Sequence, residues 1–373
     1  MRSILLIINI FFIFASCGRQ TQEATNTSIT NDYAKHFSLE QKDGYTLLEI
    51  KNPWIDAQNI NYRYAIIESS QAEIPDGLRV IRAEPGRVAA ISTTHIAFLE
   101  KLNRLGNLVA VSDKQFIYSR RFHHIDSTQG IKEVGFDTNL NIEKLLQLKV
   151  KLVFLYGISN EIEPIRKRLI RAGIVPVMIG EYMEQHPLGK AEWIKVFGAI
   201  FNQNNKAQNF FDSISNAYLQ LANMTDTLKS NPTVFTGMPW NDTWHTPGGN
   251  TYTAKLIEDA GASYIFKNDT NSVNFQYDTE IVYERAGEAD YWINPGTANS
   301  LKDIVSQDTR LELFKAYQNG KVFNNNRRAL PSGGSDYMES GVVNPHLILG
   351  DLIRIFHPNK VSKKSFHYYQ QLK

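Results

Sequence analysis

Hydrophobic and polar residues alternate in the first part of this chain, whereas later they occur as short apolar runs between helical segments. The stretches "YTLLEIKN" and "NYRYAIIES", between Tyr33 and Ser70, alternate and predict a few antiparallel strands. Further along, apolar runs at 88–91, 108–111 and 152–155 predict buried strands with helical patterns between them. Strands that alternate with helices in this way form mostly parallel sheets with helices on both faces.

The alternation of strands and helices returns in the second half, where "PTVFTG", "DYWINPG" and "KVFNNN" predict strands. Between the halves, the segment 186–228 keeps helical spacing of apolar residues, although Gly198 and the Asn-Gln run at 202–205 are points where a helix can bend or divide. We therefore predict an α/β fold with two doubly wound lobes, at 33–185 and 229–373. A long rigid helix at 186–228 joins them, and a ligand cleft lies between the lobes.

The N-terminus carries a positive residue followed by an apolar run at 4–15, which is typical of a signal peptide and too short to span a membrane as a helix. Small residues stand directly before Cys17, the only cysteine of the chain, and the pattern resembles a bacterial lipoprotein signal. We predict a signal peptide at 1–16, lipidation of Cys17 and a polar, flexible tether at 17–32. An ordinary signal peptide with an incidental cysteine is the alternative.

Composition excludes some classes of protein. The formal net charge of +2 over 373 residues argues against a nucleic-acid partner, because phosphate binding needs a concentrated basic face. A single cysteine cannot form an internal disulfide. The chain has no GxSxG, no Walker pattern and no GxGxxG, so we do not expect an enzyme, although a hydrolase built on Ser92 stays as an alternative.

Five segments carry a resemblance to a known family through their order and spacing along the chain: "RVAAISTTHIAFLEKL", "VGFDTNLNIEKLLQLKVKLVF", "HPLGKAEWIKVFGAIF", "VYERAGEADYWI" and "SGVVNPHLILGDLIRIFHP". Together they make the chain resemble the bacterial periplasmic substrate-binding lipoproteins that serve ABC importers for iron-siderophore complexes and vitamin B12. The resemblance covers roughly Arg87 to Pro358 and implies a monomer in the periplasm, lipid-anchored to a bacterial membrane. The strands before Arg87 lie outside it.

The resemblance implies that the protein captures a metal chelate, most simply a ferric siderophore or related iron complex, and delivers it to the membrane subunits of an importer. Cobalamin and haem remain alternative ligands, and a cell-surface capture protein without an importer is an alternative of another class. The loops beyond the carboxyl ends of the strands should line the cleft. Arginine forks suit carboxylate, catecholate or phosphate oxygens, and indole rings suit a flat or apolar ligand.

On these grounds the predicted ligand-binding residues are Tyr118, Arg120, Arg121, Trp240, Trp244, His245, Arg327, Arg328 and Tyr337. Two alternatives without ligand contact stay open: both tryptophans cap the core of the second lobe, and the arginines are merely solvated. We predict no cofactor and no metal site of the protein's own. Adjacent His123 and His124 tend to point apart, and no HxxxH pair occurs.

A glutamate stands on the first helical turn in matching segments of the two lobes, Glu143 and Glu280. The resemblance implies that these glutamates meet arginines on the paired membrane subunits. The alternative is that each carboxylate only stabilises the N-terminus of its helix, where a negative charge is favourable.

Overall fold

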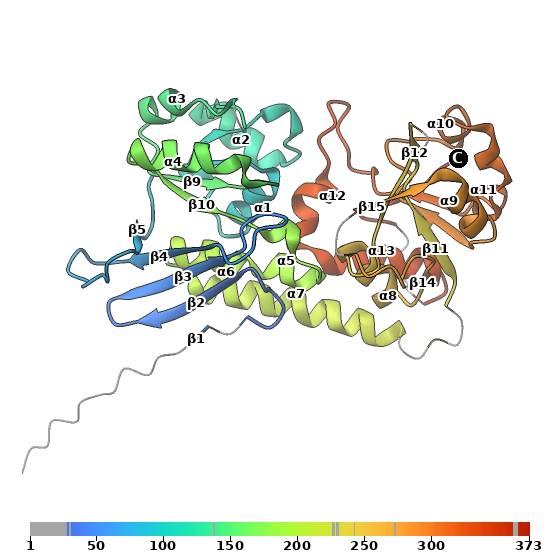
Figure 1. Cartoon of the computed structure of the whole chain (residues 1–373), viewed down its shortest axis with the longest axis horizontal. Coiled ribbons are helices and arrows are strands. Elements are labelled where there is room, and N and C mark those ends of the chain that lie inside the picture. The colour runs from blue at the N-terminus through green and yellow to red at the C-terminus, as the bar shows by residue number, and fades with distance from the viewer. Residues whose placement is uncertain are drawn as a thin grey trace, which may run out of the picture.

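The computed structural model of the chain describes residues 28–29, 31–136, 139–225, 228, 231–241, 243–271, 274–360 and 365–373. The predicted signal peptide, Cys17 and most of the predicted tether lie outside the described residues. Figure 1 shows two α/β bodies side by side, with a long helix beneath both and a further sheet beside the first body. The predicted two-lobe α/β fold is confirmed.

The first sheet has the order β1-β2-β3-β4-β5, and only the β4–β5 pair is parallel. Its strands are β1 (Ser28–Ile29), β2 (Phe37–Lys42), β3 (Tyr45–Lys51), β4 (Asn61–Ile67) and β5 (Arg79–Arg82). Burial alternates residue by residue along β3, as the sequence pattern requires of a strand with one face packed on a core. The predicted N-terminal strands are therefore present and form a sheet of their own, which we call the N-terminal sheet.

The N-lobe contains a parallel sheet of order β10-β9-β6-β7-β8. Its strands are β6 (Val88–Ala90), β7 (Leu108–Val111), β8 (Lys132–Glu133), β9 (Leu152–Leu155) and β10 (Val175–Met178), and its helices are α1 (Thr93–Lys101), α2 (Arg120–Gln129), α3 (Ile142–Gln147) and α4 (Glu163–Arg171). The chain moves from β6 to β7 on one side and later to β9 on the other. Such a reversal opens a crevice beyond the carboxyl ends of the strands.

The C-lobe contains a sheet of order β14-β11-β16-β17-β18, parallel except for β18, and a small antiparallel sheet of order β12-β13-β15. The strands are β11 (Thr233–Thr236), β12 (Pro239–Trp240), β13 (Thr243–Pro247), β14 (Ser263–Tyr264), β15 (Asn274–Asp278), β16 (Tyr291–Ile293), β17 (Val322–Asn324) and β18 (Gln370–Gln371). The helices used below are α8 (Tyr252–Asp259), α9 (Thr279–Ala286), α12 (Asp336–Glu339) and α13 (Pro345–Phe356).

The connection between the lobes is divided into three helices: α5 (Pro187–Glu192), α6 (Ile194–Ile200) and α7 (Asn204–Thr225). Asn202 has a φ of 50° and ends the α6 segment. Gly198 lets α7 come close, because a Cβ at this position would stand 2.5 Å from the Cβ of Ala207. The connection is therefore divided at the Asn-Gln run where the sequence allowed a division, and also at Trp193, which the sequence did not indicate. The 22-residue α7 still runs beneath both lobes (Figure 1).

Two buried glutamates attach the N-terminal sheet to the start of this connection. Glu192 accepts hydrogen bonds from the backbone N–H groups of residues 32–34, at 2.8 to 3.0 Å. Glu184 accepts them from residues 35 and 36 at similar distances. Lys195 pairs with Glu192 at 2.7 Å, so the buried charge is compensated.

Candidate functional site

A groove of about 520 Å³ lies where the two lobes meet. We call it the interlobe groove; it is lined by Ala97, Glu100, Lys101, Tyr118, Ser119, Arg120, Arg121, Arg328, Asp336, Glu339, Ser340, Val343, Asn344, Leu347 and His367. Its N-lobe wall comes from α1 and the segment after β7, and its C-lobe wall comes from the segment after β17 together with α12 and α13. Four of the predicted ligand residues meet here: Tyr118, Arg120, Arg121 and Arg328.

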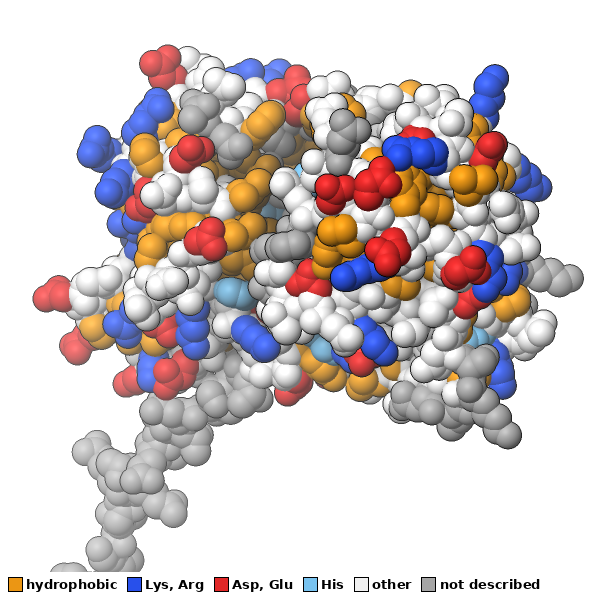
Figure 2. Space-filling model, turned by 45° about the vertical axis from the view of Figure 1, so that its right-hand side comes forward, with side chains coloured by type: hydrophobic (Ala, Val, Ile, Leu, Met, Phe, Trp, Pro, Cys, Tyr) orange, Lys and Arg blue, Asp and Glu red, His pale blue; other side chains and the backbone are white. Residues whose placement is uncertain are grey.

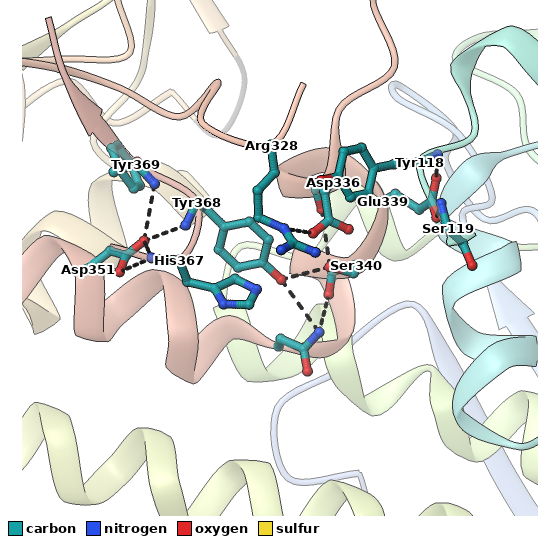
Figure 3. Close-up of polar contacts among 11 residues, drawn as sticks. Tyr118, Ser119, Arg328, Asp336, Glu339, Ser340, Asp351, His367, Tyr368 and Tyr369 are labelled. Carbon is teal, nitrogen blue, oxygen red and sulfur yellow. Dashed lines mark hydrogen bonds and ion pairs between the residues drawn. The ribbon is translucent and has the colours of Figure 1, made fainter. Parts of the chain in front are cut away.

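A carboxyl group joins the two walls of the groove. Glu339, on α12 of the C-lobe, accepts hydrogen bonds from the backbone N–H groups of Tyr118, at 2.7 Å, and Ser119, at 2.9 Å, both in the N-lobe (Figure 3). Only 2% of Glu339 is exposed. Burial raises the pKa of the Glu339 carboxyl to about 8, although the two N–H groups lower it. Glu339 therefore links the lobes, and its burial favours the neutral form of the carboxyl group.

Arg328 adds a second contact across the groove. Its guanidinium forms an ion pair with Asp336 and lies 5.1 Å from the centroid of the Tyr118 ring (Figure 3). Asp336 is buried, so its charge needs this partner. The tyrosine face is thus held by a cation from the opposite lobe, an arrangement that stabilises by about 0.5 to 2 kcal/mol.

Ser119 connects two helices of the N-lobe at the edge of the groove. As the N-cap of α2, its Oγ accepts a hydrogen bond from Phe122 N at 3.0 Å, and it also donates to the Glu100 carboxylate. The sequence placed Arg120 and Arg121 in a loop, but they form the first turn of α2. Both are exposed, and cations at a helix N-terminus are unfavourable, so the helix itself gains nothing from them.

A buried aspartate fixes the C-lobe side of the groove from behind. Asp351 on α13 accepts hydrogen bonds from the backbone N–H groups of His367, Tyr368 and Tyr369, at 2.6 to 3.2 Å. The Tyr368 hydroxyl in turn lies 2.8 Å from the Ser340 hydroxyl (Figure 3). The C-terminal segment is therefore tied to α13 and to the residue that follows α12.

A tight turn at residues 330–334 makes another contact between the lobes. Ser332 Oγ donates to the carbonyl oxygen of Gln115 at 2.6 Å. A Cβ on Gly334 would stand 2.7 Å from the carbonyl oxygen of Phe116, so only glycine fits this approach. The C-lobe thus contacts the segment after β7 at residues 115–119.

The groove is basic. Lys101, Arg120 and Arg121 have no carboxylate ion-pair partner among the described residues, and Arg328 neutralises Asp336. Of the other two acids in the lining, Glu100 and Glu339, burial raises the pKa of Glu339 and so favours its neutral form. The surplus of positive charge suits an anionic ligand.

The two tryptophans predicted to bind ligand differ in solvent exposure. Trp240 is 68% exposed on β12, whereas Trp244 on β13 is fully buried. Trp244 Nε1 donates to the Thr236 carbonyl oxygen at 2.9 Å, and its ring packs near Phe235 in the C-lobe core. The assignment of Trp244 to the ligand site was wrong, because β13 is a regular strand whose alternation turns Trp244 inward and His245 outward.

The remaining predicted ligand residues do not line the interlobe groove. Tyr337 is only 8% exposed and stands edge-on to the rings of Tyr368 and Tyr369, each with centroids 5.9 Å away. Burial raises the pKa of Tyr337 to about 12. Arg327 is exposed, and its backbone N–H donates to Tyr368 O at 3.1 Å. Tyr337 is thus a packing residue of the C-lobe.

Among the large apolar side chains exposed in the two lobes are four of which the sequence analysis singled out only one, Trp240. Phe116, Ile158 and Met338 are 41%, 63% and 63% exposed, and Trp240 is the fourth. Figure 2 shows hydrophobic side chains gathered in patches on both halves of one face. Exposed apolar groups of this size mark a contact surface. Phe116 and Ile158 follow the predicted strands at 108–111 and 152–155, which was the available signal.

Both predicted docking glutamates lie on outward-facing first turns. Glu143 is exposed on α3, whose N-cap Asn141 accepts a hydrogen bond from Lys144 N at 2.9 Å. Glu280 is 71% exposed on α9 and pairs with Arg310 at 2.8 Å. The positions agree with either role considered from the sequence, since a carboxylate at a helix N-terminus can also face a partner.

The described residues also bear on metal binding and on membrane crossing. No three His, Cys, Asp or Glu side chains come together there to hold a metal ion. His123 and His124 lie on α2, where His123 Nε2 is 2.8 Å from the Ile117 carbonyl oxygen. None of the described helices combines the length and the apolar character that crossing a membrane requires.

Comparisons with known proteins agree with this architecture. The chain is 28% identical over 311 residues to an uncharacterized lipoprotein of Methanocaldococcus jannaschii, an alignment that covers 80% of this chain and 72% of the relative. A haem-binding periplasmic protein from Pseudomonas aeruginosa has a TM-score of 0.58 at 16% identity, covering 78% of this chain and 98% of the other. A possible iron-binding solute-binding protein from Staphylococcus epidermidis has a TM-score of 0.56 at 16% identity, covering 75% and 100%.

The sequence model of the periplasmic binding proteins matches residues 88–328, which is well over half of the chain. The matched range spans the N-lobe, the connecting helices and the C-lobe as far as Arg328, and it leaves out the N-terminal sheet. The resemblance found in the sequence is confirmed, and so is the expectation that the chain is not an enzyme. This chain belongs to the periplasmic binding protein family, whose members bind substrates rather than transform them.

Proposed function

We propose that this protein captures a metal chelate, in the first place a ferric siderophore or a related iron complex, and delivers it to an ABC importer. Similar structures include proteins described as haem-binding and as possibly iron-binding, which supports an iron-containing ligand. The absence of a donor cluster among the described residues agrees with iron that arrives already chelated.

The observation that carries this proposal is the basic lining of the interlobe groove. Arg120, Arg121 and Arg328 stand on opposite walls of one cavity, together with Lys101. Carboxylate and catecholate oxygens of a chelate accept bidentate hydrogen bonds from such guanidinium groups. The volume of about 520 Å³ falls within the range of small-molecule sites.

Haem or cobalamin is the second candidate. The exposed apolar side chains Phe116, Ile158, Trp240 and Met338 favour it, because a macrocycle offers a large flat surface for them. The alternative of another class, a capture protein without an importer, differs from both candidates because it has no importer as a partner. If no importer responds to the loaded protein with increased ATPase activity, that alternative holds.

The same proposal includes the membrane anchor. Cys17 carries the lipid, and a relative named as a lipoprotein supports this assignment. The anchored protein is a monomer in the periplasm, and Glu143 and Glu280 meet cationic groups on the two membrane subunits of the importer.

Tryptophan fluorescence tests the choice of ligand, because Trp240 is exposed. The purified protein is titrated with ferric siderophores, cobalamin and haem. Arg120→Ala with Arg121→Ala should weaken binding of an anionic ferric siderophore by about tenfold or more, since charge-assisted hydrogen bonds are lost. The matched control is Arg168→Ala with Arg171→Ala, an exposed pair on α4 outside the groove.

Three results decide between the candidates. Selective loss of siderophore affinity in the groove variant supports the ferric siderophore. Quenching by haem or cobalamin that survives in the groove variant and falls in Trp240→Ala supports the macrocycle. Equal affinity of the groove variant and the control variant for every chelate contradicts the basic groove as the binding site.

A further inference from the structure

The N-terminal sheet lies outside the part of the chain that matches the family, yet it reaches the junction of the lobes. Its loop between β3 and β4 forms one wall of a second cavity, of about 470 Å³. The other walls are residues 182–185 with Lys190, at the start of the connecting helices, and residues 247–253 of the C-lobe. We call this cavity the N-terminal pocket. Its size is that of a small-molecule site.

Lys190 is the feature of this pocket that most needs a ligand. Its Nζ lies 4.3 Å from the centroid of the Tyr252 ring, and no oxygen of the described residues accepts a hydrogen bond or forms an ion pair with it. The side chain is half-buried, and burial lowers the pKa of Lys190. An ammonium group has three donors, and partly removing it from water without an acceptor is unfavourable.

Three acids lie near Lys190 or line the pocket with it, namely Glu184, Glu181 and the exposed Asp56, and none of them forms an ion pair with its ammonium group. The carboxylate oxygens of Glu184 accept hydrogen bonds from the backbone N–H groups of residues 35 and 36 and from Trp193 Nε1. Glu181 is 3% exposed and accepts a hydrogen bond from the Thr94 hydroxyl at 2.6 Å. Burial raises the pKa of the Glu181 carboxyl, which favours its neutral form. The second oxygen of Glu181 is buried without a hydrogen-bond partner, yet no described carboxylate takes up the donors of Lys190, so these donors are left for a group that enters the pocket.

Aromatic side chains from all three parts of the pocket line it together with this cation. Trp54 comes from the N-terminal sheet, Tyr182 from the N-lobe and Tyr252 from the C-lobe. The Tyr182 hydroxyl donates to the Gly157 carbonyl oxygen at 2.7 Å, which holds its ring in place. A cavity lined by aromatic rings and by an ammonium group without an ion-pair partner fits a planar ligand that carries a negative charge.

We propose that the N-terminal pocket binds an aromatic anion, a carboxylate or phenolate on a planar ring, with Lys190 as its counter-ion. This site is separate from the interlobe groove and does not depend on the chelate proposed above. It also assigns a role to the N-terminal sheet, which supplies the wall that carries Trp54. Removing the sheet's loop would leave Lys190 and Tyr252 open to solvent on that side.

The test is a calorimetric titration, in which benzoate is added to the purified protein and the heat of binding is measured. Cyclohexanecarboxylate serves as an anion without an aromatic ring, and benzamidinium as an aromatic cation. Benzoate should bind at one saturable site and more tightly than either probe. Lys190→Met should weaken benzoate binding by about tenfold or more, because the charge-assisted contact is lost. Lys190→Arg should retain it.

Lys206→Met is the matched control, because Lys206 donates to the Leu102 carbonyl oxygen far from the pocket lining. If Lys190→Met fails to fold, Lys190→Gln replaces it. Benzoate binding that is unchanged in the Lys190 variant, a preference for benzamidinium, or no saturable binding overturns the proposal. Chelate titrations of the same variants are independent: lost benzoate binding with unchanged chelate binding separates the two sites, and the reverse result affects only the proposed function.

Discussion

Replacing Glu339 with glutamine tests whether one buried carboxyl makes the contact between the lobes depend on pH. The substitution keeps the volume of the side chain and removes its ionisation. In the folded protein burial raises the pKa of Glu339 to about 8, above the ordinary glutamate value of 4.5. The folded state therefore holds this proton more tightly than the unfolded state does.

The sign of the effect follows from this difference. The contribution of Glu339 to the free energy of unfolding is fully present below about pH 4.5 and is lost as the pH rises towards about 8. Each pH unit within this window corresponds to about 1.4 kcal/mol. Between pH 5 and pH 8 the loss is therefore on the order of 4 kcal/mol.

Urea unfolding followed by circular dichroism, at several pH values across this window, measures the slope. The wild-type free energy of unfolding should fall with pH more steeply than that of Glu339→Gln. Burial also raises the pKa of Glu181 and Asp351, but these groups are present in both proteins, so the difference between the two slopes isolates Glu339. Glu312→Gln, at an exposed acid, should run parallel to the wild type. Parallel curves for Glu339→Gln and the wild type would refute the reasoning.

Three further predictions follow from the arrangement of the site and of the anchor. Trp244→Ala should lower the free energy of unfolding by about 3 to 5 kcal/mol, because a fully buried ring leaves a cavity, whereas Trp240→Ala should change it little; equal losses in thermal denaturation would contradict this. Cys17→Ser should release the protein from membranes without altering its melting temperature, and labelled palmitate on the variant would exclude this anchor. Glu143→Arg with Glu280→Arg should abolish importer-stimulated ATPase activity in proteoliposomes while chelate quenching persists; unchanged ATPase activity would remove the docking role.

The local pattern of the chain was sufficient for most of the architecture. The buried strands at 88–90, 108–111 and 152–155 are recognisable because they are apolar throughout, as strands of a parallel sheet covered on both faces must be. The helix starts at Ile142 and Thr279 were recognisable because Asn141 and Asp278 are capping residues, and the structure has both caps. These features depend on neighbours within a few residues, so periodicity and capping determine them.

The local sequence pattern could not predict which of the candidate site residues are exposed and which are buried. In "PWNDTWHTP", two tryptophans in one short segment look equivalent, yet pairing of β13 with β12 and β15 buries Trp244 and exposes Trp240. Which face of a strand is inward is decided by the sheet and the helices that pack on it. The turn-rich composition of the segment was a misleading guide, because a hairpin also uses such residues.

The interlobe groove was even less accessible to sequence reasoning. Glu339 meets Tyr118 across 221 positions of the chain, and Glu184 meets the backbone of Lys35 across 149. Nothing local to a glutamate indicates that its partner is a backbone N–H of another lobe. The sequence by itself determined the strands, helices, lobes and family of this protein. Only the tertiary structure decided which arginines share a groove, which carboxyl joins its walls and where the N-terminal sheet closes a pocket, because these contacts depend on how distant segments are brought together in space.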